Sequence, residues 1–182
     1  MILNIFKMKL ENTIRSIPNY PKKGILFRDI TALLENKKAF NFAIKKMKAI
    51  SNKFKFNKIA AIESRGFIFA SVLSFLTKKP LILLRKKNKL PADVHSVDFE
   101  LEYGTATIEV HKDSIKKNES VLIIDDLIAT GGTAEAAAKL VEISKGKVAA
   151  FIFVIDLFDL GGCDKLIKKG YKVDNLIQFP GH

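Results

Sequence analysis

Apolar residues in the first half of the chain switch between helical and strand-like spacing. From Phe40 to about Lys55 they recur at helical spacing with lysines between them, which predicts an amphipathic helix. Lys58–Ile62 is a short run of β-forming residues, and after a turn the stretch 67–77 is apolar and long enough for a helix. A further strand is predicted at 80–84. A strand, a helix and a second strand in this order form a βαβ unit, so the pattern indicates a parallel sheet.

The second half of the chain repeats this arrangement. Val121–Ile124 is apolar on both faces, as the central strand of a parallel sheet must be. A helix is predicted from about Thr133 to Lys145, ending at Gly146, and a strand at 148–155. A helix and a terminal strand are expected after Asp164. We therefore expect an α/β fold, with a mainly parallel sheet flanked by helices, in a single domain of 182 residues.

Two segments do not follow either period. Residues 14–27 contain Pro18, Pro21 and Gly24, which predicts a loop or a short helix lying over the sheet. Residues from Lys86 to about Leu101 are polar and weakly patterned, and the residues that follow, to position 110, alternate as one strand of a hairpin. A long irregular insertion is typical of a lid, so we expect a mobile hood at about 86–110.

The composition is that of an ordinary globular protein, with 48% hydrophobic and 27% charged residues. No apolar run reaches the roughly 18 to 20 residues of a membrane span, and the N-terminal residues lack the long apolar core of a secretory signal. A single cysteine, Cys163, rules out an internal disulfide, as is usual in a reducing compartment. We expect a cytoplasmic protein without membrane contact.

The segment 121–133, VLIIDDLIATGGT, joins a buried strand, two acids and a glycine-rich loop. Ligands of open α/β sheets bind where parallel strands end, and we expect this strand to end before Asp125 and Asp126. Gly131 and Gly132 allow close backbone approach, and the helix that follows turns its free N–H groups toward the loop. These features predict a phosphate cradle, with the acids placed for sugar hydroxyls or hydrated magnesium.

Other phosphate-binding and phospho-accepting patterns fit less well. Paired acids after a strand occur in phospho-receiver domains, but near the N-terminus, whereas about two thirds of this chain precedes them. A Walker loop needs Gly-Lys-Ser or Gly-Lys-Thr and a dinucleotide fold needs G-x-G-x-x-G, and neither is present. An ordinary strand-to-helix turn explains the glycines but not the adjacent acids.

The net charge of +12 favours an anionic partner, and nucleic acid is one candidate. Only four of the 31 cationic residues are Arg, and three of them, Arg28, Arg65 and Arg85, lie in blocks with other candidate site residues. The planar fork of Arg suits a phosphate or a stacked base. The few residues before Ile14 are too few for a helix-turn-helix. We therefore expect a small anionic ligand rather than nucleic acid.

The whole 121–133 string resembles the phosphoribosyl pyrophosphate signature of the type I phosphoribosyltransferases. Residues 17–34, IPNYPKKGILFRDITALL, resemble the base-recognition segment of the adenine-specific branch of that family, and 60–70 resembles its pyrophosphate loop. Residues 85–113 resemble its hood, with Glu-Tyr-Gly-Thr at 102–105. The resemblance implies transfer of the 5-phosphoribosyl group from phosphoribosyl pyrophosphate to adenine, giving AMP and pyrophosphate in purine salvage. It also implies Mg²⁺ as cofactor and a homodimer.

The resemblance assigns roles to four groups of residues. The catalytic group is Glu102, Asp125 and Asp126. The 5-phosphate group is Ala129, Thr130, Gly131, Gly132 and Thr133. The pyrophosphate group is Ser64, Arg65, Gly66, Arg85, Lys86, Lys89 and Tyr103. The adenine group is Leu26, Phe27 and Arg28, with the base read by backbone near Ile25–Phe27 and stacked on Phe27. No residue is assigned as a direct metal ligand, because Mg²⁺ arrives with the substrate.

The chain departs from the family pattern at two positions. Ala92 follows Leu90-Pro91 where a glycine is usual, which would alter the hood if that glycine carries a positive φ. Asp156 stands where Glu is usual, and the shorter acid is expected to weaken a structural or dimer contact. Two rival functions stay open: another purine phosphoribosyltransferase, and a regulator that keeps the sugar-pyrophosphate pocket as a sensor and binds nucleic acid.

Overall fold

The computed structural model describes residues 9–101 and 104–181, and its main feature is a seven-stranded sheet in the order β5-β6-β4-β3-β7-β8-β9. The five strands from β4 to β9 run parallel, and β6 and β5 are added antiparallel at one edge. The sheet strands are β3 (Lys58–Ile62), β4 (Leu81–Lys86), β5 (Val94–Leu101), β6 (Gly104–His111), β7 (Ser120–Ile128), β8 (Lys147–Leu157) and β9 (Val173–Phe179).

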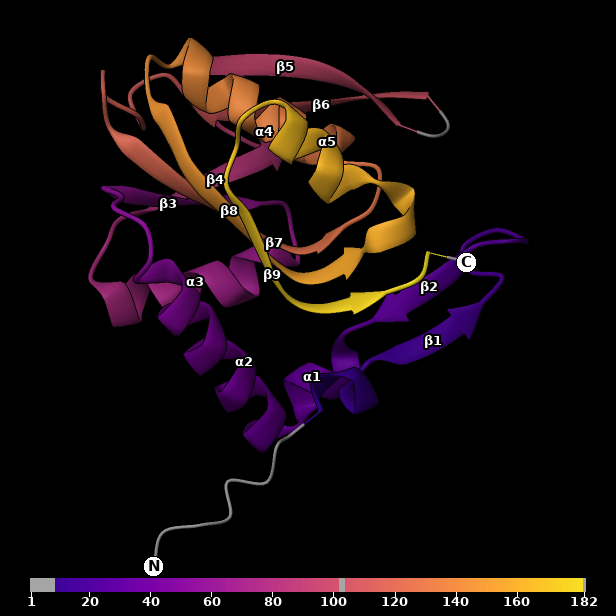
Figure 1. Cartoon of the computed structure of the whole chain (residues 1–182). Helices are drawn as coiled ribbons and strands as arrows, with labels where there is room; N and C mark the ends of the chain where they lie inside the picture. Colours follow the sequence, from indigo (N-terminus) through magenta and orange to yellow (C-terminus); the bar gives the residue numbers. More distant parts are fainter. Residues whose placement is uncertain (1–8, 102–103, 182) are drawn as a thin grey trace, which may run out of the picture.

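Helices cover both faces of this sheet, as the sequence predicts (Figure 1). The α-helices are α1 (Thr31–Glu35), α2 (Lys37–Ser51), α3 (Gly66–Thr77), α4 (Gly132–Ile143) and α5 (Gly162–Lys168), with short 3-10 helices η1 (Leu10–Thr13) and η2 (Phe158–Leu160). The α2 and α3 helices lie on one face, and α4 and α5 on the other. The expected α/β fold with a mainly parallel sheet is confirmed.

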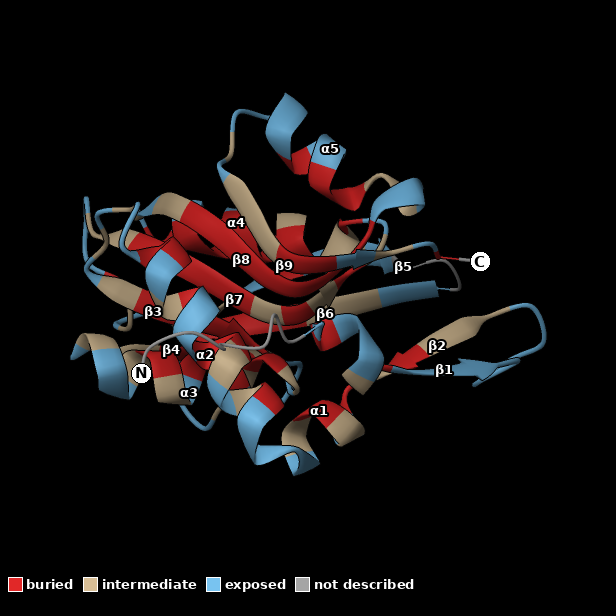
Figure 2. Ribbon diagram, turned by 60° about the horizontal axis from the view of Figure 1, so that its bottom comes forward, coloured by how far each residue is buried: buried red, intermediate tan, exposed pale blue. Residues whose placement is uncertain are grey.

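The central strands are buried on both sides because their side chains alternate between two cores (Figure 2). On β7, Leu122 and Ile124 pack with α2 and α3, while Val121 and Ile123 pack with α4 and the β5–β6 hairpin. A strand with period-two burial on both faces reads as a continuous apolar run, which is why the sequence indicated a parallel sheet.

Three predicted elements differ from the structure. Residues 14–27 hold a two-stranded antiparallel hairpin, β1 (Arg15–Pro18) with β2 (Leu26–Asp29), rather than a loop or a short helix. All four residues of β1 are exposed, so no apolar pattern marks the strand. In the predicted hood, the part expected to be irregular contains β5. The α2 helix ends at Ser51 rather than near Lys55.

Among the described residues, no helix is long and apolar enough to cross a membrane.

Candidate active site

The two acids lie within β7, not after it as the sequence analysis expected. Pairing of β7 with β3 stops at Ala61↔Ile124, but pairing with β8 continues to Ile128↔Asp156. From Asp125 onward, therefore, β7 has a hydrogen-bonded neighbour on one side only. Apolar residues mark where a strand is buried on both sides, and they do not mark where one-sided pairing ends. The prediction of a strand end before Asp125 was wrong for this reason.

The start of α3 packs against β7 where pairing with β3 ends. A Cβ atom at Gly66 would lie 2.8 Å from Asp125 Oδ1 and 2.9 Å from the Ile124 carbonyl oxygen, which is closer than such contacts allow. Only glycine fits at this position. The turn that leads into α3, with a cis peptide between Glu63 and Ser64, thus lies directly beside the acid pair.

The acid pair is electrostatically strained. Burial raises the pKa of Asp125 well above its ordinary value although the side chain keeps some contact with a cavity, and the neighbouring Asp126 raises it further. Burial also raises the pKa of Asp126, and Arg65 opposes this effect. Arg65 Nε forms an ion pair with the buried Asp126 Oδ2 at 2.9 Å. Two adjacent acids in one buried site favour a proton or a cation between them.

The glycine loop and the first turn of α4 follow from the end of β7. Gly131 has a φ of +83°, which glycine adopts without strain, and its carbonyl accepts the first helical hydrogen bond of α4, from Glu135 N at 2.9 Å. The N–H groups that precede this bond are the unpaired donors of a helix N-terminus. They face the same loop as the Thr130 and Thr133 side chains, so the loop can hold an anion.

Gly162, which the sequence analysis missed, supports this loop by packing against its backbone. Gly162, at the start of α5, donates from its N–H to the Ala129 carbonyl at 3.0 Å. A Cβ atom here would lie 2.3 Å from that carbonyl oxygen and 2.9 Å from Gly131 N. In the sequence, the one feature that could have pointed to Gly162 is the Gly-Gly pair at 161–162, and Gly162 is 30 residues away from Gly132.

One cavity of about 630 Å³ brings the predicted base segment to the phosphate loop. Gly24, Ile25 and Leu26 line it together with Asp125 and the loop from Ala129 to Thr133. Phe153, Leu157 and Leu160 add apolar surface. A volume of this size suits a small organic ligand rather than a polymer.

The predicted pyrophosphate residues on β4 are organised by Glu63, which the sequence analysis did not single out. Glu63 Oε2 accepts from Lys86 N at 2.8 Å and from Arg85 Nε at 3.2 Å. Burial raises the pKa of Glu63, but these hydrogen bonds and charges outweigh it and hold the pKa below its ordinary value. Arg85 Nη1 also reaches the Lys89 carbonyl at 3.4 Å. Arg85, Lys86 and Lys89 thus form one cluster with the turn before α3, outside the 630 Å³ cavity.

The three predicted adenine residues point in different directions. Leu26 lines the cavity. The Phe27 ring packs edge-on against Tyr20 with centroids 5.1 Å apart, and Arg65 lies over it with Cζ 5.3 Å from the centroid. Arg28 is 5% exposed, does not line the cavity and turns its guanidinium toward the end of β9. The structure therefore brings Leu26 to the cavity, but neither the Phe27 ring nor the side chain of Arg28 lines it.

The hood reaches the phosphate loop through β5. Glu100 lines the cavity, and its carbonyl oxygen would lie 3.0 Å from a Cβ atom placed on Gly132. Glu102 and Tyr103 lie outside the described residues. Ala92 does not have a positive φ, so the missing glycine does not strain the backbone there. The described hood residues with a positive φ are Asn88, at +63°, and Gly104, at +99°.

Asp156, the second departure from the family pattern, is buried in β8 and keeps side-chain contacts with β9. Gln178 Nε2 donates to Asp156 Oδ2 at 3.0 Å, with Asn175 Nδ2 at 3.4 Å. Burial, together with Asp156, raises the pKa of Cys163 to about 12, so this thiol stays protonated. The shorter acid therefore still ties β8 to β9.

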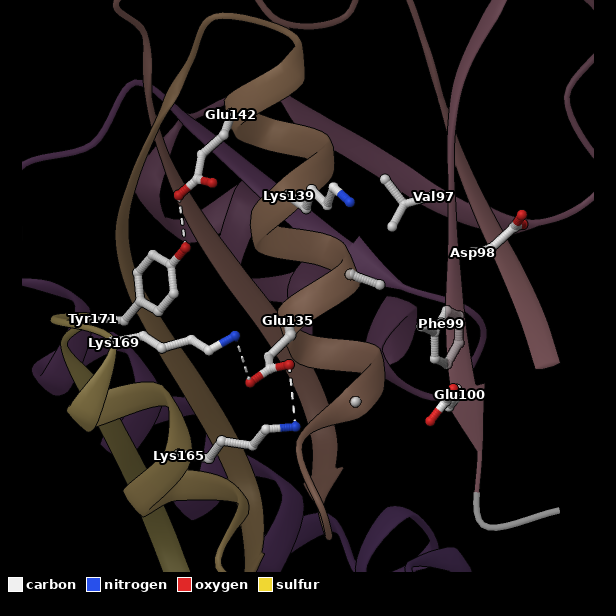
Figure 3. Close-up of a pocket in the computed structure, with 12 residues that line it drawn as sticks. Val97, Asp98, Phe99, Glu100, Glu135, Lys139, Glu142, Lys165, Lys169 and Tyr171 are labelled. Atoms are coloured by element: carbon white, nitrogen blue, oxygen red, sulfur yellow. Dashed lines mark hydrogen bonds and ion pairs between the residues drawn. The ribbon is translucent and has the colours of Figure 1, made fainter. Parts of the chain in front are cut away.

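A second groove, of about 530 Å³, lies between β5, α4 and α5 (Figure 3). Lys165 of α5 and Lys169, directly after α5, each come within 3.1 Å of one carboxylate oxygen of Glu135, in the first turn of α4. Tyr171 donates to Glu142 Oε1 at 2.6 Å. The two lysines hold the pKa of Glu135 below its ordinary value, although burial raises it. These contacts fix α5 against the helix that carries the phosphate loop.

Within the part of the chain that the structure describes, no cluster of three or more His, Cys, Asp or Glu side chains could hold a metal by itself. Mg²⁺ commonly binds through one or two carboxylates together with water and substrate phosphates. The Asp125–Asp126 pair fits that second mode, because Asp125 lines a cavity that also contains an anion loop and Asp126 lies buried directly beside it.

Residues 29–179 match the model of the phosphoribosyl transferase domain family. The chain therefore belongs to the phosphoribosyltransferase family. Within it, the chain is similar throughout to the adenine phosphoribosyltransferases. It is 71% identical to the adenine phosphoribosyltransferase of Pelagibacter ubique over 96% of this chain and 100% of that protein.

Solved structures agree with this placement. The crystal structure of the Thermoanaerobacter pseudethanolicus adenine phosphoribosyltransferase superposes with a TM-score of 0.89 at 45% identity, covering 94% of this chain and 100% of that one. The Saccharomyces cerevisiae enzyme, crystallised with an imino-altritol bisphosphate and adenine, superposes with a TM-score of 0.85 at 33% identity, covering 92% and 96% of the two chains.

Proposed function

We propose that this chain transfers the 5-phosphoribosyl group of phosphoribosyl pyrophosphate to adenine, giving AMP and pyrophosphate for purine salvage. The observation that carries the proposal is the single cavity lined by Gly24–Leu26, by Asp125 of the acid pair and by the anion loop. A nucleotide needs these three surfaces, for its base, its ribose and its phosphate. The similarity to adenine phosphoribosyltransferases over nearly the whole chain supports the same reaction.

The 5-phosphate is held by the loop from Ala129 to Thr133. Unpaired N–H groups at the start of α4 and the Thr130 and Thr133 hydroxyls donate to its oxygens, and the helix dipole favours its charge. Because a 12-residue helix orients these donors before the ligand arrives, binding the phosphate fixes the ribose without reorganising the loop.

The ribose ring lies over Asp125 and Asp126. Breaking the bond from the anomeric carbon to pyrophosphate develops positive charge on the sugar. Two carboxylates in a buried site stabilise that charge more strongly than they would in water. The repulsion between them in the unliganded protein is relieved when ribose hydroxyls donate to them and the cation binds.

The leaving pyrophosphate departs toward the turn before α3, where Ser64, Arg65 and Gly66 offer N–H donors and a guanidinium. The cluster that Glu63 organises, with Arg85, Lys86 and Lys89, adds positive charge from the end of β4. Mg²⁺ bound with the substrate would neutralise the pyrophosphate, with Asp125 and Asp126 as its protein contacts through water or hydroxyls.

Adenine binds between the backbone around Ile25–Phe27 and the apolar wall of the cavity. The Phe27 ring, which packs against Tyr20 and Arg65 in the unliganded protein, stacks on the base only if it turns into the cavity. Glu102 acts as acid or base toward the purine, and Tyr103 shields the reacting bond when the hood closes. Closure excludes water, which would otherwise hydrolyse the activated sugar. The contact of Glu100 with Gly132 supports this arrangement, because it places the strand that precedes Glu102 on the phosphate loop.

The test is AMP formation from phosphoribosyl pyrophosphate, Mg²⁺ and adenine, compared with hypoxanthine and guanine as alternative bases. We expect turnover with adenine and a loss of at least about a hundredfold in the Asp125→Asn, Asp126→Asn double variant, since this change removes the charge that stabilises the transition state. Turnover of hypoxanthine or guanine at a similar rate would move the chain to another purine specificity. Binding without any turnover would overturn the enzyme proposal.

We further propose that the enzyme is a cytoplasmic homodimer whose copies meet through the outer face of α3. This helix contains no charged residue, and Ile68, Phe75 and Leu76 on it are exposed, Phe75 to 81%. A helix that is apolar on all sides is normally buried, and a second copy would cover this face.

A further inference from the structure

Residues 179–181 are the last residue of β9 and the two that follow it, and they reach the part of the cavity lined by Gly24–Leu26, here called the base end. β9 runs toward β2, so the two segments lie side by side although they are far apart in sequence (Figure 1). Gly181 lines the cavity together with Gly24–Leu26. A Cβ atom on Gly181 would lie 2.6 Å from Leu160 Cγ, and Leu160 also lines the cavity. Gly181 and the Leu160 side chain that it contacts thus form part of the wall of the base end.

Arg28 holds this segment from the side of β2. Its Nη2 donates to the Pro180 carbonyl at 2.6 Å, its Nη1 donates to Ser16 Oγ on β1, and its Cζ lies 4.6 Å from the centroid of the Phe179 ring. The side chain therefore joins both strands of the hairpin to the end of β9. Lysine, with one compact ammonium group, cannot form a fork of donors and stack on a ring at the same time.

Asp159 holds the same segment from the other side. Its Oδ1 accepts from Gly181 N at 2.6 Å, and the residue belongs to η2, which also carries Leu160. Burial lowers the pKa of Arg28 and the charge of Asp159 raises it, so the two residues interact across the segment. A guanidinium that is 5% exposed, with its Nε unpaired among the described residues, is costly to bury. This cost indicates that Arg28 is needed to position the segment 179–181 rather than to stabilise the fold in general.

We propose that Arg28 and Asp159 are positioning residues that hold residues 179–181 as a wall of the base pocket, and that this wall helps to select the purine. The inference rests on the proposed function, in which this end of the cavity takes adenine. Arg28 then acts on the base through the segment it holds. Arg28 contacts Ser16, Phe179 and Pro180, and Asp159 contacts Gly181, and none of these four partners belongs to the 5-phosphate loop.

The test compares binding of AMP, which has a base, with binding of ribose 5-phosphate, which has none, by calorimetry. We expect Arg28→Lys and Asp159→Asn each to weaken the binding of AMP by about tenfold. The affinity for ribose 5-phosphate should stay within about twofold of the wild type, since only the base end loses its wall. In the reaction, KM for adenine should rise while KM for phosphoribosyl pyrophosphate and kcat stay near the wild type. The rate ratio of adenine to 2,6-diaminopurine should also change.

The matched control is Arg15→Lys, the same substitution on the same hairpin at a side chain that is 56% exposed and pairs with Asp29 and Glu35. It should leave all these values unchanged. If the two test variants lose affinity for both ligands equally, or lose affinity for neither, the positioning role is wrong. If Arg28→Lys does not fold, Asp159→Asn decides alone. A wild type that binds ribose 5-phosphate but makes no AMP would instead overturn the proposed function.

Discussion

Asp125 is an acid whose charged form the folded protein disfavours. Because its folded pKa lies above the unfolded value, the folded state binds more protons, and this residue lowers stability as pH rises through the folded pKa. Asp125→Asn removes the charge and keeps an oxygen that can accept from Asp126 N, as Asp125 Oδ1 does at 2.8 Å. We expect the variant to be more stable near neutral pH by roughly 1 to 2 kcal/mol, although inactive.

Thermal denaturation at neutral and mildly acidic pH checks this prediction. The melting temperature should rise by roughly 2 to 8 °C near neutral pH, and the difference should shrink on acidification. Asp113→Asn, at an exposed acid, serves as the control and should change little. A destabilised Asp125→Asn would show that the carboxylate makes a favourable contact in the unliganded state.

Gly162 supports the phosphate loop without facing the ligand. In Gly162→Ala the new methyl group meets the Ala129 carbonyl, a backbone atom that moves only with the loop itself. We expect a loss of about 1 to 3 kcal/mol of stability and weaker binding of ribose 5-phosphate, while pyrophosphate binding is kept. Calorimetric titration with each ligand separates the two effects.

The comparison for this change is Gly170→Ala. Gly170 has a φ of +87° but no atom near the position of a Cβ. The only destabilising effect of this variant is therefore the strain of placing alanine in a left-handed backbone conformation. It should lose stability without losing ribose 5-phosphate binding. If Gly162→Ala binds both ligands as the wild type does, the loop does not depend on this contact.

At the scale of elements, the ion pairs between α4 and α5 predict a pH-dependent contribution to stability. The folded pKa of Glu135 lies below its unfolded value, so its contribution is fully present above the unfolded pKa and is lost as pH falls through the folded pKa. Glu135→Gln should therefore cost about 1 kcal/mol near neutral pH and nothing in acid. Melting curves across this pH range measure the difference, with exposed Glu11→Gln as control; a constant difference would contradict the assignment.

How well an element could be predicted depends on its surroundings. β3 and α3 were predicted within one residue because burial on both faces, or on most of a helix, leaves a clear apolar pattern. β1 was missed because all its residues are exposed, and β5 because its outward side chains are polar. In the candidate site, the acids and glycines are contiguous in sequence and were found together. Glu63 and Gly162 were missed because their partners come from other segments.

At the scale of the whole molecule, the outer face of α3 predicts the oligomeric state. If two copies meet there, the wild type should sediment as a dimer and Phe75→Glu as a monomer, because a charge at the centre of an apolar interface is costly to bury. Ile167→Glu, at a residue 54% exposed on α5 across the sheet, should remain dimeric. A dimeric Phe75→Glu, or a monomeric wild type, would rule out this face.

The one-sided pairing of β7 beyond Ile124 has a consequence for dynamics. The acid pair extends from a strand whose earlier residues are held by β3 and β8 and buried on both faces, whereas β5 of the hood is an edge strand paired only with β6. Backbone amides on such a central strand exchange with solvent only through global unfolding, and those of an edge hairpin exchange through local opening. We therefore expect amides of β5 to exchange faster than those of the central part of β7, so that the hood could open and return while the aspartates keep their geometry.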